Sequence, residues 1–160
     1  MLFRILSLIA LFLIFTNYSY SAATSSGDTE SNYDKAAKLI KTAKKYESKG
    51  KDKKAKKRYE RALKFLVKAN KEKPNQAATL NYLGFATRKL GDYEKGEKYY
   101  LLGLEIDPNH KGINEYLGEL YVVTNRIDLA KQRLDVLKNC NCEEYNELKE
   151  IIEGKKQSKY

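Results

Sequence analysis

The sequence predicts an all-α protein. Its 160 residues include only two prolines, Pro74 and Pro108, and 42% of them are hydrophobic, which is enough for one modest core. Lysine, leucine and alanine, which favour helices, are frequent. No segment alternates β-branched and polar residues as a half-buried strand does. We therefore expect a single helical domain.

The first 23 residues have the three-part pattern of a secretory signal peptide. A short positively charged start, residues 1–4, is followed by the apolar run 5–15 and then by small polar residues. We expect cleavage after Ala23, with Ser21 as the alternative. The segment is also compatible with an uncleaved membrane anchor, although the run is shorter than the roughly 20 apolar residues of a spanning helix. Both interpretations place the rest of the chain outside the cytoplasm, in the periplasm or secreted.

Residues 24–33 are polar and rich in serine and threonine, which predicts a flexible linker. Helical periodicity begins at Asp34, a plausible N-cap, and continues to Gly50. A second amphipathic segment extends from Asp52 to about residue 73, where Pro74 stops it. These two segments predict an N-terminal helical hairpin.

An internal repeat of 34 residues follows. At this shift Asn81-Tyr82-Leu83-Gly84 aligns with Glu115-Tyr116-Leu117-Gly118, and Gly91 aligns with Asn125. Within the segment LNYLGFATRKLGDYEKGEKYYLLGLEIDPN, which starts at residue 80, large and small residues stand at fixed places. This segment resembles the tetratricopeptide repeat (TPR), a pair of antiparallel helices of 34 residues.

The glycines explain how such helices pack. Two helices approach closely only where each carries a small residue at the crossing, and Gly84 with Gly96 fills these positions in the first clear repeat. Gly118 with Ala130 is the equivalent pair in the second. Gly103 is expected to contact the following repeat. Gly91, followed by Asp92, has the pattern of a turn between two helices.

The TPR resemblance implies an α-solenoid within residues 34–153. Two repeats are clear, 77–110 and 111–142, and one divergent repeat precedes them. Residues 143–153 place apolar side chains on one stripe and are predicted to form a capping helix over the last repeat. Gly154 then ends the helix, and residues 154–160 are expected to be a disordered tail.

The resemblance also implies a concave groove, lined by the first helix of each repeat, that holds a segment of a partner protein. We expect groove positions at Ala37, Ile40, Lys44 and Glu47, at Asn81, Phe85, Arg88 and Lys89, and at Glu115, Glu119, Val122 and Val123. Plain solvated helix surface is the alternative for each of them. Some TPR proteins grip a C-terminal carboxylate with a polar clamp, but here Tyr82, Gly112 and Tyr116 stand where it needs polar residues.

Positive charge is concentrated in the N-terminal hairpin. Residues 34–73 contain 17 lysines and arginines against 5 acidic residues, while the whole chain has a net charge of +10. Such a surface is most often simply solvated, but it also favours weak association with an anionic membrane or an acidic partner. Export removes the chain from most nucleic acid, so no nucleic-acid partner is expected.

Cys140 and Cys142 are the only cysteines. Outside the cytoplasm a disulfide between them is one option. Free or intermolecular thiols are a second option, and a two-thiolate copper site is the third. The sequence offers few further soft ligands for copper, and no metal site is predicted.

No catalytic arrangement is apparent in the sequence. Its single histidine, His110, has no companion that the pattern places beside it, and no glycine-rich phosphate loop occurs. The sequence thus predicts a non-enzymatic interaction module without a cofactor, binding a protein or peptide in its groove. The alternative is an accessory protein that handles thiols or copper through Cys140 and Cys142.

Overall fold

The computed structural model describes residues 30–158, and these form seven helices and no strand. The helices are α1 (Asn32–Glu47), α2 (Asp52–Glu72), α3 (Ala77–Lys89), α4 (Tyr93–Ile106), α5 (Lys111–Val123), α6 (Ile127–Leu137) and α7 (Glu143–Ile152). The predicted signal peptide, 1–23, and most of the predicted linker lie outside the described residues.

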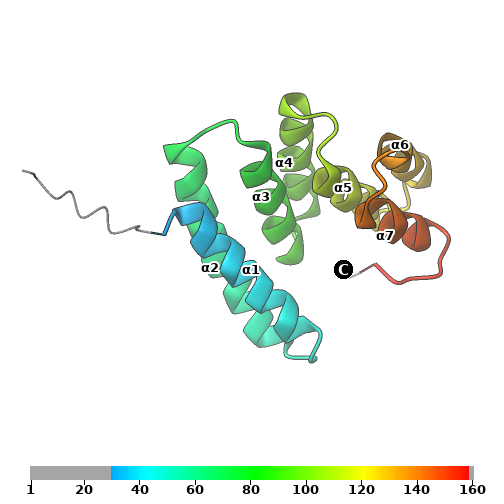
Figure 1. The fold of residues 1–160 in the computed structure, drawn as a ribbon. Coiled ribbons are helices and arrows are strands. Elements are labelled where there is room, and N and C mark those ends of the chain that lie inside the picture. Colours follow the sequence, from blue (N-terminus) through cyan, green and yellow to red (C-terminus); the bar gives the residue numbers. More distant parts are fainter. Residues whose placement is uncertain (1–29, 159–160) are drawn as a thin grey trace, which may run out of the picture.

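The helices pack as consecutive pairs. α1 packs against α2, α3 against α4 and α5 against α6, while α7 packs against both α5 and α6. Figure 1 shows the pairs following one another from the α1–α2 hairpin to α7. The predicted all-α array of helical hairpins with a terminal helix is confirmed. Within residues 30–158, no helix combines the length and the apolar character needed to cross a membrane.

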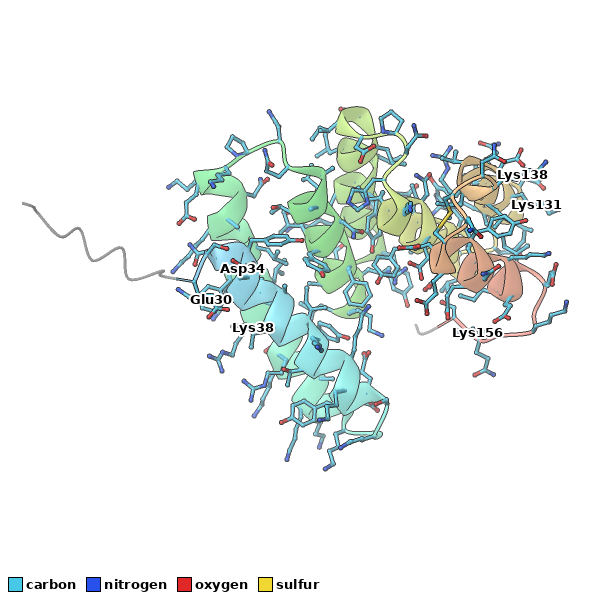
Figure 2. The ribbon with its side chains drawn as sticks, in the orientation of Figure 1. Glu30, Asp34, Lys38, Lys131, Lys138 and Lys156 are labelled. Atoms are coloured by element: carbon cyan, nitrogen blue, oxygen red, sulfur yellow. A yellow bond between two sulfur atoms is a disulfide. The ribbon has the colours of Figure 1, made fainter. Side chains whose placement is uncertain are left out.

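Side chains cap the first turn of several helices. α1 begins two residues before the expected Asp34, because the Ser31 hydroxyl accepts a hydrogen bond from the Asp34 backbone N–H at 3.1 Å. Glu30, Asp34 and Lys38 lie together at this end (Figure 2), and Lys38 pairs with Glu30 at 3.0 Å. His110 caps α5, since its Nδ1 accepts from the Ile113 backbone N–H at 3.2 Å. The histidine thus has a local structural role.

The turn inside each clear repeat uses a residue with positive φ. Gly91 has φ 95° between α3 and α4, and Asn125, which aligns with it, has φ 58° between α5 and α6. Glycine and asparagine are the residues that tolerate this left-handed conformation. Asp92 then caps α4 by accepting from the Lys95 backbone N–H at 3.1 Å. The predicted role of Gly91 and Asp92 in the turn is confirmed.

The close approach predicted between Gly84 and Gly96 is present. A Cβ added at Gly96 would lie 3.2 Å from the Gly84 carbonyl oxygen and 3.1 Å from the Cβ of Arg88. A Cβ added at Gly84 would lie 2.5 to 2.9 Å from ring atoms of Tyr100, which is fully buried. Each backbone therefore contacts the facing helix directly. Gly103 packs under Ile113 of α5, as predicted for a contact with the next repeat.

The equivalent site in the last repeat is built differently. The sequence pairs Gly118 with Ala130, but the atoms nearest to a Cβ added at Gly118 all belong to Leu148 of α7, starting at 2.5 Å. Leu134 stands at the position of Tyr100 and is only partly buried. Because leucine is shorter than tyrosine, the space over Gly118 is filled from the capping helix instead. α7 is thus an integral part of the last repeat.

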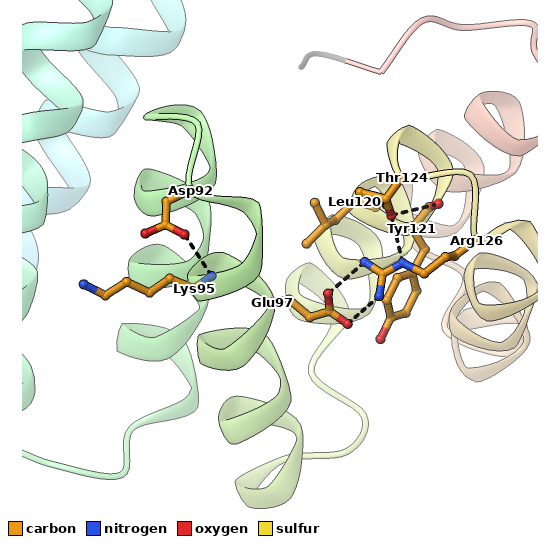
Figure 3. A network of polar contacts seen from close by, with 7 residues as sticks. All are labelled: Asp92, Lys95, Glu97, Leu120, Tyr121, Thr124 and Arg126. Carbon is orange, nitrogen blue, oxygen red and sulfur yellow. Dashed lines mark hydrogen bonds and ion pairs between the residues drawn. The ribbon is translucent and has the colours of Figure 1, made fainter.

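A bidentate ion pair joins the two clear repeats. The guanidinium of Arg126, in the α5–α6 turn, donates to both carboxylate oxygens of Glu97 on α4 at 2.8 and 2.7 Å (Figure 3). Its Nε donates to the Thr124 hydroxyl at 2.9 Å, and it lies over the Tyr121 ring at 4.5 Å. This geometry is among the stronger forms of ion pair, and it links α4 of one repeat to the α5–α6 turn of the next.

Candidate functional site

The concave face carries a row of three cavities that share lining residues. The cavity at the end of α1, about 720 Å³, includes Lys44, Glu47, Phe85 and Lys89. The next, about 370 Å³, includes Ile40, Lys44, Tyr82 and Tyr116. The third, about 530 Å³, includes Asn81, Tyr82, Gly112, Tyr116 and Glu144. The row therefore extends from α1 across α3 and α5 to α7.

Tyr116 is the centre of this face. Its hydroxyl accepts a hydrogen bond from Nζ of Lys44 at 2.8 Å, which spans from α5 to α1. Its ring lies 4.9 Å from the ring of Phe85, and the Lys44 ammonium sits 4.5 Å above that second ring. The arrangement combines a cation–π contact with a tilted aromatic pair. It presents an apolar patch beside a positive charge.

A second polar group lies at the α1 end of the groove. Oε1 of Glu47 pairs with Nζ of Lys89 at 2.8 Å, and Oε2 accepts from the Tyr59 hydroxyl at 2.8 Å. Burial, followed by this hydrogen bond to a carboxylate, raises the pKa of Tyr59. Tyr59 therefore remains a protonated donor, and it holds Glu47 in position toward the groove.

Arg88 forms the floor of the groove. It is 2% exposed, and its guanidinium donates to the Tyr116 carbonyl oxygen at 2.7 Å and pairs with Glu119 at 3.6 Å. The rings of Phe85 and Tyr116 each lie 5.4 Å from it. Burial lowers the pKa of Arg88, and the negative charge of Glu119 opposes this effect. A charge enclosed in this way is tolerated because it is paired and hydrogen-bonded.

Glu115 lies beside this pair on α5 and is 8% exposed. Burial, together with the negative charges of Glu119, Glu144 and Glu147, raises the pKa of Glu115 from 4.5 to about 8, while the positive charge of Lys44 opposes this shift. Carboxyl groups from α5 and α7 therefore gather at one end of the groove, and one of them retains its proton near neutral pH.

The structure gathers most of the predicted groove residues, but it places them at different depths. Phe85, Lys89, Asn81 and the α1 positions Ala37, Ile40, Lys44 and Glu47 line the three cavities. Arg88, Glu115 and Glu119 are buried beneath them. Val122 is partly buried against the core cluster that contains Tyr100 and Ile113, and Val123 is 39% exposed at the end of α5. Neither valine lines any of these cavities.

Tyr82 and Tyr116 align with each other in the two repeats and stand where a carboxylate clamp needs polar residues, so they are not among the predicted groove positions, yet each lines two of the cavities. Their aromatic character at equivalent positions of the two repeats was the available signal. The partner of Lys44 lies 72 positions away in the sequence. Only the curvature of the array brings these residues together.

Cys140 and Cys142 form a disulfide just before α7. Cysteine binds copper or zinc as a thiolate, and a sulfur atom in a disulfide is not a thiolate. The oxidised pair therefore does not offer the two-thiolate copper site considered above. Among residues 30–158, no group of three or more histidine, cysteine, aspartate or glutamate side chains is arranged to hold a metal ion.

Solved structures with a similar architecture include several TPR domains and a type III secretion chaperone. The first TPR domain of Spaghetti (RPAP3), bound to the HSP90 peptide SRMEEVD, is 20% identical with a TM-score of 0.53; the match covers 79% of this chain and 97% of that one. The Sgt2 TPR domain from Aspergillus fumigatus is 17% identical with a TM-score of 0.56, over 79% and 82% of the two chains. The Yersinia enterocolitica type III secretion translocator chaperone SycD is 19% identical with a TM-score of 0.54, over 76% and 88%.

No protein-family model matches the sequence, and no curated protein sequence matches it either. At these identities the similarity establishes the fold. The chain has a tetratricopeptide repeat fold, as the spacing of its small and large residues predicted.

Glu115 gives the site a measurable pH dependence. Its pKa is higher in the folded chain than in the unfolded one, so the folded state loses stability as the pH rises from 4.5 to about 8. We expect Glu115→Gln to increase the free energy of unfolding at pH 8.5 by at least about 1 kcal/mol, with no gain below pH 4.5. Urea unfolding of wild type and variant at both pH values measures this.

Glu105→Gln, which removes an exposed carboxylate from α4, is the matched control. An equal effect of the two substitutions at pH 8.5 would refute the assigned environment of Glu115.

Proposed function

We propose that this chain is a non-catalytic interaction scaffold that binds a segment of a partner protein along its concave face. The observation that carries the proposal is the continuous row of cavities lined by side chains of α1, α3 and α5. One structural neighbour holds a peptide, SRMEEVD of HSP90. This supports peptide binding as a use of the fold and does not identify the partner.

The lining of the groove indicates what such a segment offers. The aromatic rings of Phe85, Tyr82 and Tyr116 suit an apolar side chain. Lys44 and Lys89 lie on the α1 side, and Glu144 lies on the α7 side. An extended segment with an apolar anchor and charges of opposite sign on its two flanks would satisfy both sides. This arrangement differs from a clamp for a C-terminal carboxylate.

Peptide selection tests this function. Peptides selected from a random 12-residue library on the purified chain should bind it measurably by calorimetry. Tyr82→Ala and Lys44→Ala should weaken binding of the selected peptides at least about five-fold, because each removes a groove contact. Lys64→Ala, which changes an exposed lysine of α2, is the control. Selected peptides that bind both groove variants as tightly as the control would contradict the proposal.

We further propose that the chain is exported and works outside the cytoplasm. The support is the three-part pattern of residues 1–23 together with the disulfide between Cys140 and Cys142. Expressed with its own leader, the exported chain should begin at Thr24 by N-terminal sequencing. A chain that is retained in the cytoplasm with Met1 in place would refute export.

The basic N-terminal hairpin is proposed to add weak affinity for an anionic membrane surface. Figure 2 shows side chains with nitrogen tips around α1 and α2, and Lys54, Lys57, Arg58 and Arg61 surround one surface cavity of α2. Each such cation contributes about 1 kcal/mol near anionic lipid. Sedimentation with phosphatidylserine vesicles in low salt measures this, and an equal amount bound to neutral vesicles would exclude it.

A further inference from the structure

The C-terminal tail turns back beneath α7 instead of extending away from it. Gly154 has φ 70°, and the backbone N–H groups of Lys155 and Lys156 donate to the Glu150 carbonyl oxygen at 2.9 and 3.2 Å. These bonds end the helix and reverse the chain. Figure 1 shows residues after α7 returning toward α5 and the first hairpin. The tail was expected to be disordered, but its residues 154–158 have a defined path.

The tail brings a positive charge to the carboxylates of α7 and α5. The Lys156 ammonium forms an ion pair and hydrogen bond with Oε1 of Glu147, and Figure 2 shows Lys156 on the segment beneath α7. Glu150 and Glu119 add to the negative potential at the Lys156 ammonium. By contrast, Lys155 pairs with Glu153 at 2.7 Å and remains within the tail. Two adjacent lysines thus have different surroundings.

Two residues later the tail enters the groove. The Ser158 hydroxyl donates to Oε2 of Glu119 at 3.4 Å, and Glu119 is the partner of Arg88 in the groove floor. Ser158 also lines the 720 Å³ cavity together with Lys44, Phe85 and Lys89. Among the residues of 30–158 that line this cavity, Ser158 is the only one that follows α3 in the sequence. The tail therefore runs from α7 past Glu119 of α5 to the cavity at the end of α1.

We propose that the tail beginning at Lys155 is an internal ligand of the groove, which a partner segment must displace. The inference rests on the proposed function, because it concerns the same groove. The internal ligand uses a lysine against Glu147 and a small hydroxyl against Glu119. A partner segment that takes the place of the tail is expected to bring a cationic group to Glu147, where the Lys156 ammonium now lies. We therefore expect a basic partner segment at the α7 end of the groove.

Reversing one charge of the tail tests the proposal in the full chain. Lys156→Glu places a carboxylate beside Glu147, Glu150 and Glu119, and so repels the tail from the groove. Lys155→Glu makes the same change of net charge one residue away and is the matched control. The probe is a fluorescein-labelled peptide of residues 153–160, EGKKQSKY, added in trans and followed by fluorescence anisotropy.

We expect Lys156→Glu to bind the probe at least about five-fold more tightly than wild type, because its own tail no longer competes. Lys155→Glu should stay within two-fold of wild type. Adding Glu147→Gln to Lys156→Glu should reduce the gain, since the probe lysine loses its partner. Far-UV circular dichroism of each variant checks that the fold is kept.

The proposal of an internal ligand would be overturned if the probe bound wild type, Lys156→Glu and Lys155→Glu with equal affinity. It would also be overturned if the probe did not bind Lys156→Glu. The same variants tested with the library-selected peptides separate this result from failure of the groove itself. The selected peptides could depend on Tyr82 and yet bind wild type and Lys156→Glu equally. That result would support the proposed peptide-binding function and would refute only the role of the tail as a competing ligand.

Discussion

The structure depends on the close contact between α3 and α4, where a glycine on each helix lets the facing helix approach its backbone. Gly84 leaves room for the ring of Tyr100, and Gly96 lies against the backbone and Cβ of Arg88. A glycine inside a helix lowers helix stability by about 1 kcal/mol relative to alanine. The packing between α3 and α4 must offset this loss at both Gly84 and Gly96. Tyr100 and Arg88, both almost completely buried, are the side chains that this contact encloses.

The same contact shapes the concave face. Because Arg88 is held against Gly96, its guanidinium extends under Phe85 to the Tyr116 carbonyl oxygen and to Glu119. One side chain therefore joins the packing between α3 and α4 to the floor of the groove on α5. The carboxylates beside it, on α5 and α7, lie within reach of the C-terminal tail. Repeat packing, groove chemistry and tail position are linked through these few residues.

The sequence predicted the fold well, because TPR packing is local. The spacing of Gly84, Gly91 and Gly96 reports contacts within about 20 residues, which a periodic pattern can encode. It could not predict that Leu148 of α7 covers Gly118, because that contact depends on the short Leu134 and on where the capping helix docks. Likewise, the contact of Lys44 with Tyr116 joins positions 72 residues apart through the curvature of the array. Arg88 and Glu119 were predicted to line the groove, but they are buried in its floor. The ion pair between them allows both charges to be buried.

The free energy of unfolding of Gly84→Val tests the central contact most directly. Valine at this position would overlap the ring of buried Tyr100, and overpacking of a dense core costs about 1 to 3 kcal/mol. We predict a loss in that range by urea unfolding, whereas Ala78→Val, at an exposed position of the same helix, should change stability by less than about 0.5 kcal/mol. If Gly84→Val were as stable as wild type, with unchanged helix content, the two helices would not meet as described and the groove built on them would be wrong.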